Sequence, residues 1–162
     1  MASELNNLSE FEFTVPSAEG MNIAIVVAKW NSDITSKLLE GAENLCREKG
    51  AKFSTHFVPG TYELTMGAKM VADKLKVDAV IAIGCVIKGD TPHFEYICSG
   101  VTHGLNMVAI DCNIPVIFGV LTVNTHEQAM ERCGGRLGNK GEEAAATAIS
   151  MVALGNNLPH IL

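Results

Sequence analysis

A hydroxyl group and an imidazole follow an apolar segment in residues 84–95, which read G-C-V-I-K-G-D-T-P-H-F-E. The run 78–83 before them is almost wholly aliphatic, the pattern of a strand buried on both faces of a parallel sheet. Thr91 stands just before a predicted helix, and the first amide groups of a helix bind phosphate readily. His93 has a side chain suited to proton transfer near neutral pH. The segment predicts an anion site beside an acid-base group; the alternative is a helix start whose histidine only hydrogen-bonds to backbone.

Other candidate residues follow the remaining predicted strands. Trp30 is the sole tryptophan, and its ring either stacks on a planar heterocycle or packs under the next helix. Thr61 and Glu63 could hold ligand hydroxyls, although a carboxylate in the first turn of a helix is also stabilised by the helix dipole. Arg132 and Lys140 flank a glycine-rich turn at 134–138, where they serve either an anionic ligand or the ends of helices.

The elements that must position these residues alternate between β and α. Strands are expected at 22–27, 52–58, 78–83 and 116–121. Helices are expected at 33–49, 64–75, 94–107 and 142–154, with a short one capped by Thr125 and Gln128, and Gly155 beyond the last. This alternation predicts one domain with a parallel, helix-covered sheet. The strand ends, including Phe118 and Thr122, would then meet along one rim as an aromatic, polar-edged pocket.

Residues 1–20 are expected to form an arm that precedes the domain at 21–162. Phe11, Phe13 and Val15 alternate with polar residues, which is typical of a short strand. Such a strand would pair with its own sheet or with that of another subunit. A disordered tail is the alternative, because chain termini are usually loose.

Composition excludes several classes of function. The 162 residues carry a net charge of −6 and scattered cations, so no nucleic-acid partner is expected. No apolar run approaches the length that crosses a bilayer, so no membrane role is expected. Five cysteines without C-x-x-C spacing indicate free thiols and a cytoplasmic location. No metal site is predicted from the scattered histidines, and the common dinucleotide and nucleoside-triphosphate motifs are absent.

Six motifs in order together resemble the lumazine synthase family over about residues 22–154. They are A-K-W-N-S-D-I-T (28–35), V-P-G-T-Y-E-L (58–64), I-G-C-V-I-K-G-D-T-P-H-F-E-Y (83–96), P-V-I-F-G-V-L-T (115–122), E-Q-A-M-E-R-C-G (127–134) and G-N-K-G-E-E-A-A (138–145). The resemblance implies a flavodoxin-like three-layer α/β/α domain with a four-stranded parallel sheet. It also implies a transferase of riboflavin biosynthesis. The reaction would join 5-amino-6-(D-ribitylamino)uracil to 3,4-dihydroxy-2-butanone 4-phosphate, giving 6,7-dimethyl-8-ribityllumazine, phosphate and water, without metal or other cofactor.

The resemblance also implies roles for individual residues. His93 matches the family's proton-transfer residue, and Arg132 its phosphate-binding arginine. The other positions match substrate contacts: Trp30 and Phe118 at the pyrimidine ring, Thr61, Tyr62 and Glu63 at the ribityl chain, Cys85, Val86 and Ile87 at the ring's other edge, Asp90 and Thr91 in the phosphate loop, and Lys140 beside it. Asp90 departs from the family, which often has a small neutral residue there.

Assembly and three rival functions complete the expectations. Family members form pentamers with active sites between subunits, and some build icosahedral shells; the compact segment 132–140 favours a shell. In such assemblies the N-terminal strand pairs with a neighbouring subunit. The rivals are a riboflavin synthase of the archaeal type, a non-catalytic flavin or lumazine carrier or shell protein, and a flavodoxin-like binding module. Phosphate release during turnover separates the first rival from a lumazine synthase.

Overall fold

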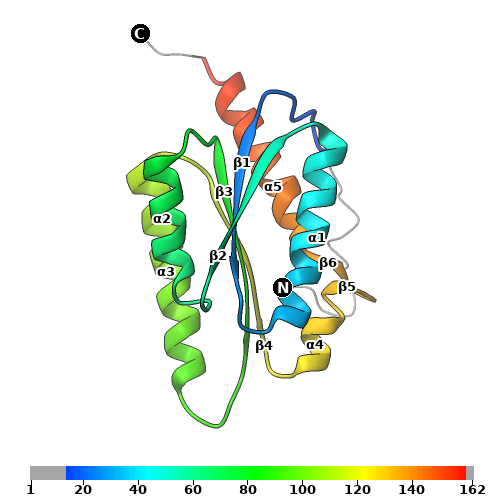
Figure 1. Ribbon diagram of the computed structural model, residues 1–162, viewed down its shortest axis with the longest axis vertical. Coiled ribbons are helices and arrows are strands. Elements are labelled where there is room, and N and C mark those ends of the chain that lie inside the picture. Colours follow the sequence, from blue (N-terminus) through cyan, green and yellow to red (C-terminus); the bar gives the residue numbers. More distant parts are fainter. Residues whose placement is uncertain (1–13, 160–162) are drawn as a thin grey trace.

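A parallel sheet lies between two layers of helices in the computed structural model, which describes residues 14–159 (Figure 1). The strands β1 (Asn22–Ala28), β2 (Lys52–Val58), β3 (Ala79–Ile87) and β4 (Val116–Val123) are ordered β2-β1-β3-β4. One face is covered by α1 (Ser32–Lys49), α5 (Lys140–Asn157) and the short α4 (His126–Met130), and the other by α2 (Leu64–Lys74) and α3 (His93–Cys112). The predicted flavodoxin-like three-layer fold is confirmed. Phe11 and Phe13 of the predicted N-terminal strand lie outside the described residues, and Val15 is buried but belongs to no strand.

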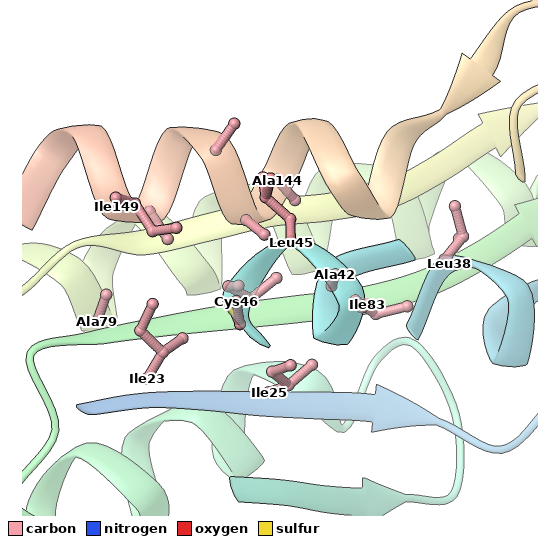
Figure 2. Packing of buried hydrophobic residues seen from close by; sticks show 14 of the residues in the cluster. Ile23, Ile25, Leu38, Ala42, Leu45, Cys46, Ala79, Ile83, Ala144 and Ile149 are labelled. Carbon is pink, nitrogen blue, oxygen red and sulfur yellow. The ribbon is translucent and has the colours of Figure 1, made fainter. Parts of the chain in front are cut away.

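Alternate residues of β1 feed two separate cores. Ile23, Ile25 and Val27 pack against α1 and α5, in the cluster that Figure 2 shows. The residues between them, Ala24, Val26 and Ala28, pack against α2 and α3. All six are at most 1% exposed, as expected for a central strand of a parallel sheet covered on both faces. The apolar pattern of α1 is confirmed too, since Ile34, Leu38, Ala42 and Leu45 are buried in the first core.

Strand β3 runs further than predicted. It continues past Ile83 to Ile87, because β4 pairs with it as far as Ile87 opposite Val123. The expectation that residues 85–87 belong to a loop is therefore wrong. Glycine and cysteine in the run hid the continuation, which depends on the neighbouring strand rather than on local preference. Strand β4 likewise extends two residues beyond the predicted 121.

The glycine-rich turn contains a small hairpin. Strands β5 (Cys133–Gly135) and β6 (Gly138–Asn139) pair antiparallel, with Gly134 and Gly138 at positive φ. Helix α5 begins at Lys140 rather than at 142, because the Asn139 side chain accepts hydrogen bonds from the first amides of the helix. The helix also includes Gly155, predicted to lie beyond its end, since one glycine lowers helix propensity without ending a helix that packs along its length.

Helices α1 and α5 touch through their backbones where α5 begins. A Cβ atom added to Gly141 would meet the carbonyl oxygen of Leu38, a separation that no rotation of a side chain relieves. Gly141 therefore sets the distance between the two helices on this face of the sheet.

We predict opposite effects for two glycine-to-alanine changes in α5. Gly141→Ala should destabilise the protein by about 1–3 kcal/mol or more, because the backbone of α1 must move to make room. Gly155→Ala should stabilise it by about 0.5–1 kcal/mol, because the site is open and alanine favours the helix. Urea unfolding midpoints at equal protein concentration measure both changes, and an unaltered midpoint for Gly141→Ala would contradict the close helix contact.

Candidate active site

Loops from two neighbouring strands are joined by backbone hydrogen bonds at the carboxyl edge of the sheet. After β1, the amide of Lys29 donates to the carbonyl of Val58 at 2.9 Å, and the amide of Trp30 donates to that of Pro59 at 3.1 Å. These bonds continue the parallel ladder beyond the last paired residues of β1 and β2. Trp30 is thereby fixed beside the loop that carries Thr61, Tyr62 and Glu63.

The Trp30 ring lies over Gly60, with one face covered and much of the side chain open. A Cβ atom on Gly60 would come within 2.7 Å of the ring and 3.0 Å of the Glu63 carboxylate, so no larger residue fits beneath the indole. The carboxylate is turned back to accept from the Gly60 amide at 3.1 Å. Trp30 is 68% exposed despite this contact. The result is a flat aromatic surface with a carboxylate at its border, suited to a polar heterocycle.

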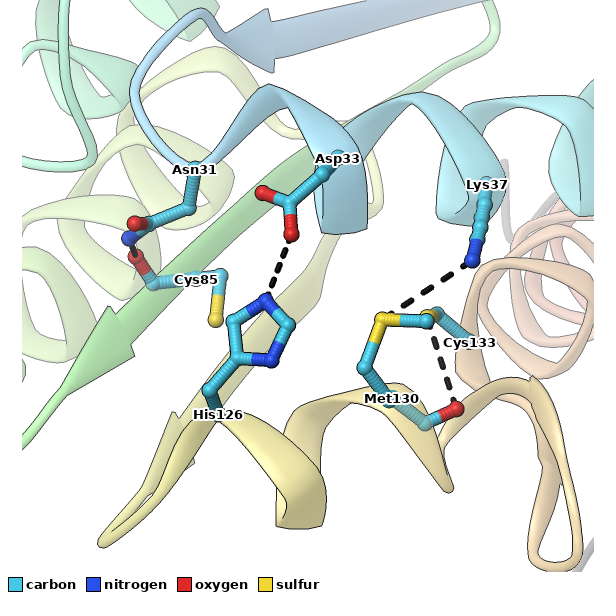
Figure 3. Close-up of polar contacts among 7 residues, drawn as sticks. All are labelled: Asn31, Asp33, Lys37, Cys85, His126, Met130 and Cys133. Carbon is cyan, nitrogen blue, oxygen red and sulfur yellow. Dashed lines mark hydrogen bonds and ion pairs between the residues drawn. The ribbon is translucent and has the colours of Figure 1, made fainter.

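The carbonyl oxygen of Cys85 joins the third strand to this cluster. It accepts from the Asn31 side-chain amide at 2.9 Å, drawn in Figure 3, and from the Thr61 hydroxyl at 3.4 Å. Asn31 has the left-handed backbone that asparagine tolerates better than most residues, with φ 57°. Gly84 leaves room for the buried Thr61, whose hydroxyl would be 2.8 Å from an added Cβ. Side chains from the β1 and β2 loops therefore meet at one backbone atom of β3.

Burial raises the pKa of the Cys85 thiol to about 12. The thiol stays protonated at neutral pH, so Cys85 offers a small apolar wall rather than a nucleophile. Val86 and Ile87, next along β3, are half-buried; Ile87 packs on the same face of the sheet as Cys85, and Val86 packs on the opposite face, against α2 and α3.

Tyr62 packs across α3. Its ring would lie 3.3 Å from a Cβ atom on Gly100, and Thr65 similarly occupies the space beside Gly104. These two glycines thus let α2 and the residues before it approach α3 closely. The packing holds Tyr62 at the border of the cluster with 59% of its surface exposed.

The predicted phosphate loop leads from β3 to α3. The amide of Lys88 donates to the carbonyl of Val123 at 2.9 Å, which anchors the loop beside the end of β4. Asp90, Thr91 and His93 are all exposed, and α3 begins at His93, one residue earlier than predicted. Among the described residues, no side chain caps this helix start. The Thr91 hydroxyl stands two residues before the first amide of this helix, a sequence of donors that favours an anion.

Three further predicted residues lie elsewhere, along the outer edge of β4. Arg132 and Lys140 line a groove of about 620 Å³ that follows this strand, and Phe118 lies within it. Lys140 is paired with Glu143 at 2.6 Å, which offsets the unfavourable position of a cation at a helix start. Arg132 donates to the carbonyl of Gln128 at 2.8 Å. We call Phe118, Arg132 and Lys140 the β4 group, and the residues at the ends of β1, β2 and β3 the rim group.

The expectation that Phe118 lies on the common rim is wrong. Phe118 pairs with Ala82, which in turn pairs with Val26, so these three residues form one row across the middle of the sheet. Trp30 lies four residues beyond Val26 and on the far side of β3, about 13 Å along the strands and about 10 Å across them. One small planar ring does not reach both aromatic residues within a single subunit.

A side-chain pair connects the loop after β4 to α1. His126, the first residue of α4, shares a 2.5 Å hydrogen bond with Asp33 in the first turn of α1, as Figure 3 shows. Thr125 accepts from the amide of Gln128 at 3.3 Å, which confirms the predicted helix cap. Since Arg132 bonds to the backbone of α4, the pair helps to place the β4 group.

Sequence reasoning missed Asp33 and the bridging role of Asn31. The two residues stand beside Trp30 in the chain, and both Asn and Asp are common where helices begin. Nothing in their spacing indicates partners as distant as Cys85 and His126.

The fold and the rim group together define a flavodoxin-like α/β protein with a candidate ligand site at the carboxyl edge of its sheet. The model of the family described as 6,7-dimethyl-8-ribityllumazine synthase matches residues 20–156. A protein of that name from Parabacteroides distasonis is 54% identical, covering 94% of this chain and 98% of its own. One from Phocaeicola vulgatus is 51% identical (94% and 93%), and one from Porphyromonas gingivalis 49% (95% and 98%). The chain belongs to the 6,7-dimethyl-8-ribityllumazine synthase family.

Two kinds of site are not found within residues 14–159. No cluster of three or more His, Cys, Asp or Glu side chains there is arranged to hold a metal ion. No helix within that range is both long and apolar enough to cross a membrane.

We predict that the Asp33–His126 pair stabilises the protein in a pH-dependent way. The hydrogen bond from His126 lowers the pKa of Asp33 below its ordinary 3.8. Because the pKa of Asp33 is lower in the folded state than in the unfolded state, ionisation of Asp33 stabilises the fold. This stabilisation is present above pH 3.8 and is lost as the pH falls through the pKa of the folded state. Urea midpoints should therefore be lower for Asp33→Asn than for the unchanged protein near pH 6, and the difference should shrink below pH 3.8.

His126→Asn is the matched variant, because it removes the same bond from the other side. The double variant should be about as stable as either single variant, because each single change already removes the bond. Additive losses from the two single changes would show that the residues act independently.

Proposed function

We propose that this protein joins 5-amino-6-(D-ribitylamino)uracil to 3,4-dihydroxy-2-butanone 4-phosphate, forming 6,7-dimethyl-8-ribityllumazine, phosphate and water. The observation that carries the proposal is the meeting of Asn31 and Thr61 at the Cys85 carbonyl. It ties the loops that carry Trp30 and Thr61 to β3, the strand that leads to the uncapped start of α3. A flat heterocycle and a phosphate are the two chemical groups that such a site accommodates. Membership of the family supports the same pair of substrates.

In this proposal the pyrimidine stacks on Trp30. Cys85, Val86 and Ile87 wall its other edge, where an apolar strand excludes water from the ring. Thr61, Tyr62 and Glu63 receive the ribityl chain, whose hydroxyls match the Thr61 hydroxyl and the Glu63 carboxylate. Glu63 keeps its bond to the Gly60 amide and still offers a second oxygen as an acceptor.

The phosphate of the second substrate binds at the start of α3. The Thr91 hydroxyl and the first amides of the helix donate to its oxygens, and Arg132 and Lys140 supply positive charge. Asp90 is exposed, so its backbone can take part in the loop that binds the anion while its carboxylate stays in solvent. A carboxylate turned inward would repel the phosphate.

The chemistry needs proton transfers but no electron transfer. The amine of the pyrimidine attacks the ketone and water leaves as the imine forms. The phosphate then departs by elimination, with loss of a proton from carbon. Elimination leaves an enol, which tautomerises to a new ketone. The ribitylamino nitrogen closes the ring on this new carbonyl, with loss of a second water. His93 moves protons in these steps, while most of the rate enhancement comes from holding two reactive molecules together.

We further propose that two subunits share each site, in a pentamer or a shell of pentamers. The separation of the rim group from the β4 group supports this, because a second copy can place its Phe118, Arg132 and Lys140 against the rim of the first. The outer side of β4 is an edge of the sheet, open to such a neighbour. The arm at residues 1–20, preceding the domain at 21–162, then pairs with a neighbouring sheet. Free cysteines favour the cytoplasm as the place of action.

Mixing the two substrates with purified protein tests the reaction directly. We expect lumazine absorbance and inorganic phosphate to rise together in equal amounts. Consumption of added lumazine without phosphate release would instead indicate a riboflavin synthase. Binding without turnover would indicate a carrier.

His93→Ala should slow product formation by roughly the 10²-fold that general acid-base catalysis contributes, leaving a measurable rate. Positioning of the two substrates survives the change, which is why activity is not abolished. His103→Ala is the control, since it makes the same substitution further along α3. A rate for His93→Ala equal to that of the control would remove His93 from the mechanism.

Arg132→Ala should raise KM for the phosphate substrate by about 10- to 100-fold and leave KM for the pyrimidine near its original value. Arg136→Ala, an exposed arginine of the same hairpin paired with Glu131, is the control and should change neither KM. Equal increases in both KM values for Arg132→Ala would place the arginine outside the phosphate site.

A further inference from the structure

We infer that Asn139 is a positioning residue that sets where Arg132 and Lys140 lie, and so tunes phosphate affinity without touching substrate. The inference rests on the proposed function for the identity of the phosphate substrate. Asn139 is the last residue of β6 and precedes Lys140 directly. It lies at the junction of the hairpin, α1 and α5.

The Asn139 side chain uses both of its ends. Its oxygen accepts from the amides of Gly141 at 2.8 Å and Glu142 at 3.4 Å, which satisfies the first turn of α5. Its nitrogen donates to the carbonyl of Lys37 at 2.9 Å, in the middle of α1. An ordinary helix cap needs only the oxygen. The nitrogen therefore does something additional, which is to hold the start of α5 against α1.

Glycines in both helices allow this close packing. A Cβ atom on Gly41 would come to 2.5 Å from the Asn139 amide group, so α1 has a glycine where the amide lies. Gly141, on the other side, allows the backbone contact with Leu38 described above. The amide has little freedom to move while α1 and α5 keep this spacing.

Both cations of the β4 group follow the position of Asn139. The amide of Lys140 donates to the carbonyl of Arg132 at 2.9 Å, and Cys133 pairs with Asn139 in the hairpin. Lys140 is also held by Glu143, one turn along α5. A shift of Asn139 relative to α1 moves the start of α5 and the hairpin together, and with them the charges that face the phosphate.

The chemistry of the amide explains why other caps do not replace it. Serine supplies a capping oxygen but is too short to donate to Lys37 as well. Aspartate keeps the shape but has no donor, and adds a negative charge beside the phosphate site. Asparagine alone among the common caps supplies donor, acceptor and neutrality at this length.

Two variants test the inference from opposite sides. Asn139→Ser retains a cap and loses the tie to α1, and Gly41→Ala displaces the amide from the α1 side. Each should raise KM for the phosphate substrate about tenfold, as the weakening of one charge-assisted hydrogen bond does, with KM for the pyrimidine unchanged. The dissociation constant for inorganic phosphate, measured by calorimetry, should rise by the same factor.

Asp78→Ala is the matched control for simple destabilisation. Asp78 accepts from the amide of Asn22 at 2.7 Å, at the opposite end of the sheet. It should lower the urea midpoint and change neither KM nor phosphate binding. A merely structural Asn139 would behave like this control, and unchanged phosphate KM and phosphate binding in Asn139→Ser and Gly41→Ala would overturn the inference.

Failure of the proposed function gives a different pattern. If the unchanged protein forms no lumazine but binds inorganic phosphate, weaker binding by the two variants upholds the positioning role alone. If the unchanged protein neither forms lumazine nor binds phosphate, both conclusions fall. If it is active and the variants match it in phosphate KM and binding, only the positioning role is lost.

Discussion

The functional loops depend on the register in which β1 pairs with β2 and β3. Ile23, Ile25 and Val27 face the α1 and α5 side, while Ala24, Val26 and Ala28 face the α2 and α3 side. Both faces are apolar, so residue size specifies the register rather than polarity. A slip of one residue would drive isoleucine into the space of alanine and overpack the core beneath α2. Because the register is fixed, Trp30, Thr61 and Cys85 all lie at the carboxyl end of the sheet.

Helix α1 then relates the two groups of site residues to each other. Its start holds Asn31 and Asp33, which bond to β3 and to α4. Its middle holds Gly41, which makes room for the amide that caps α5. Lys37 adds a weaker contact to the sulfur of Met130 at 3.8 Å, visible in Figure 3. One helix therefore carries contacts to the rim and to the base of the β4 group, and its stiffness keeps their relative position constant within a subunit.

Sequence patterns predicted the elements well and the site only in part. Apolar runs and helical patterns are local, so they located β1, β2 and α1 within one residue. The extension of β3 through Cys85 to Ile87 was missed, because it exists only through pairing with β4. Trp30, Thr61 and His93 were recognisable by residue type beside strand ends and helix starts. Phe118 already lies inside the predicted strand at 116–121, so its distance from the rim follows from the sequence pattern itself. The bonds of Asn139 to α1 arise from long-range contacts, which no short motif encodes.

The distance between the rim group and the β4 group has a consequence at the level of the assembled protein. If each site takes its rim from one subunit and its cations from the next, no folded subunit is an enzyme by itself. Dilution that separates the copies would extinguish turnover while every domain stays intact. Two inactive variants, one changed at Trp30 and the other at Arg132, would form some intact sites when mixed. In those sites one variant supplies an unchanged Trp30 and the other supplies an unchanged Arg132. Selection then acts on the contact between copies. A change that weakens this contact lowers catalytic activity, however far it lies from the substrate.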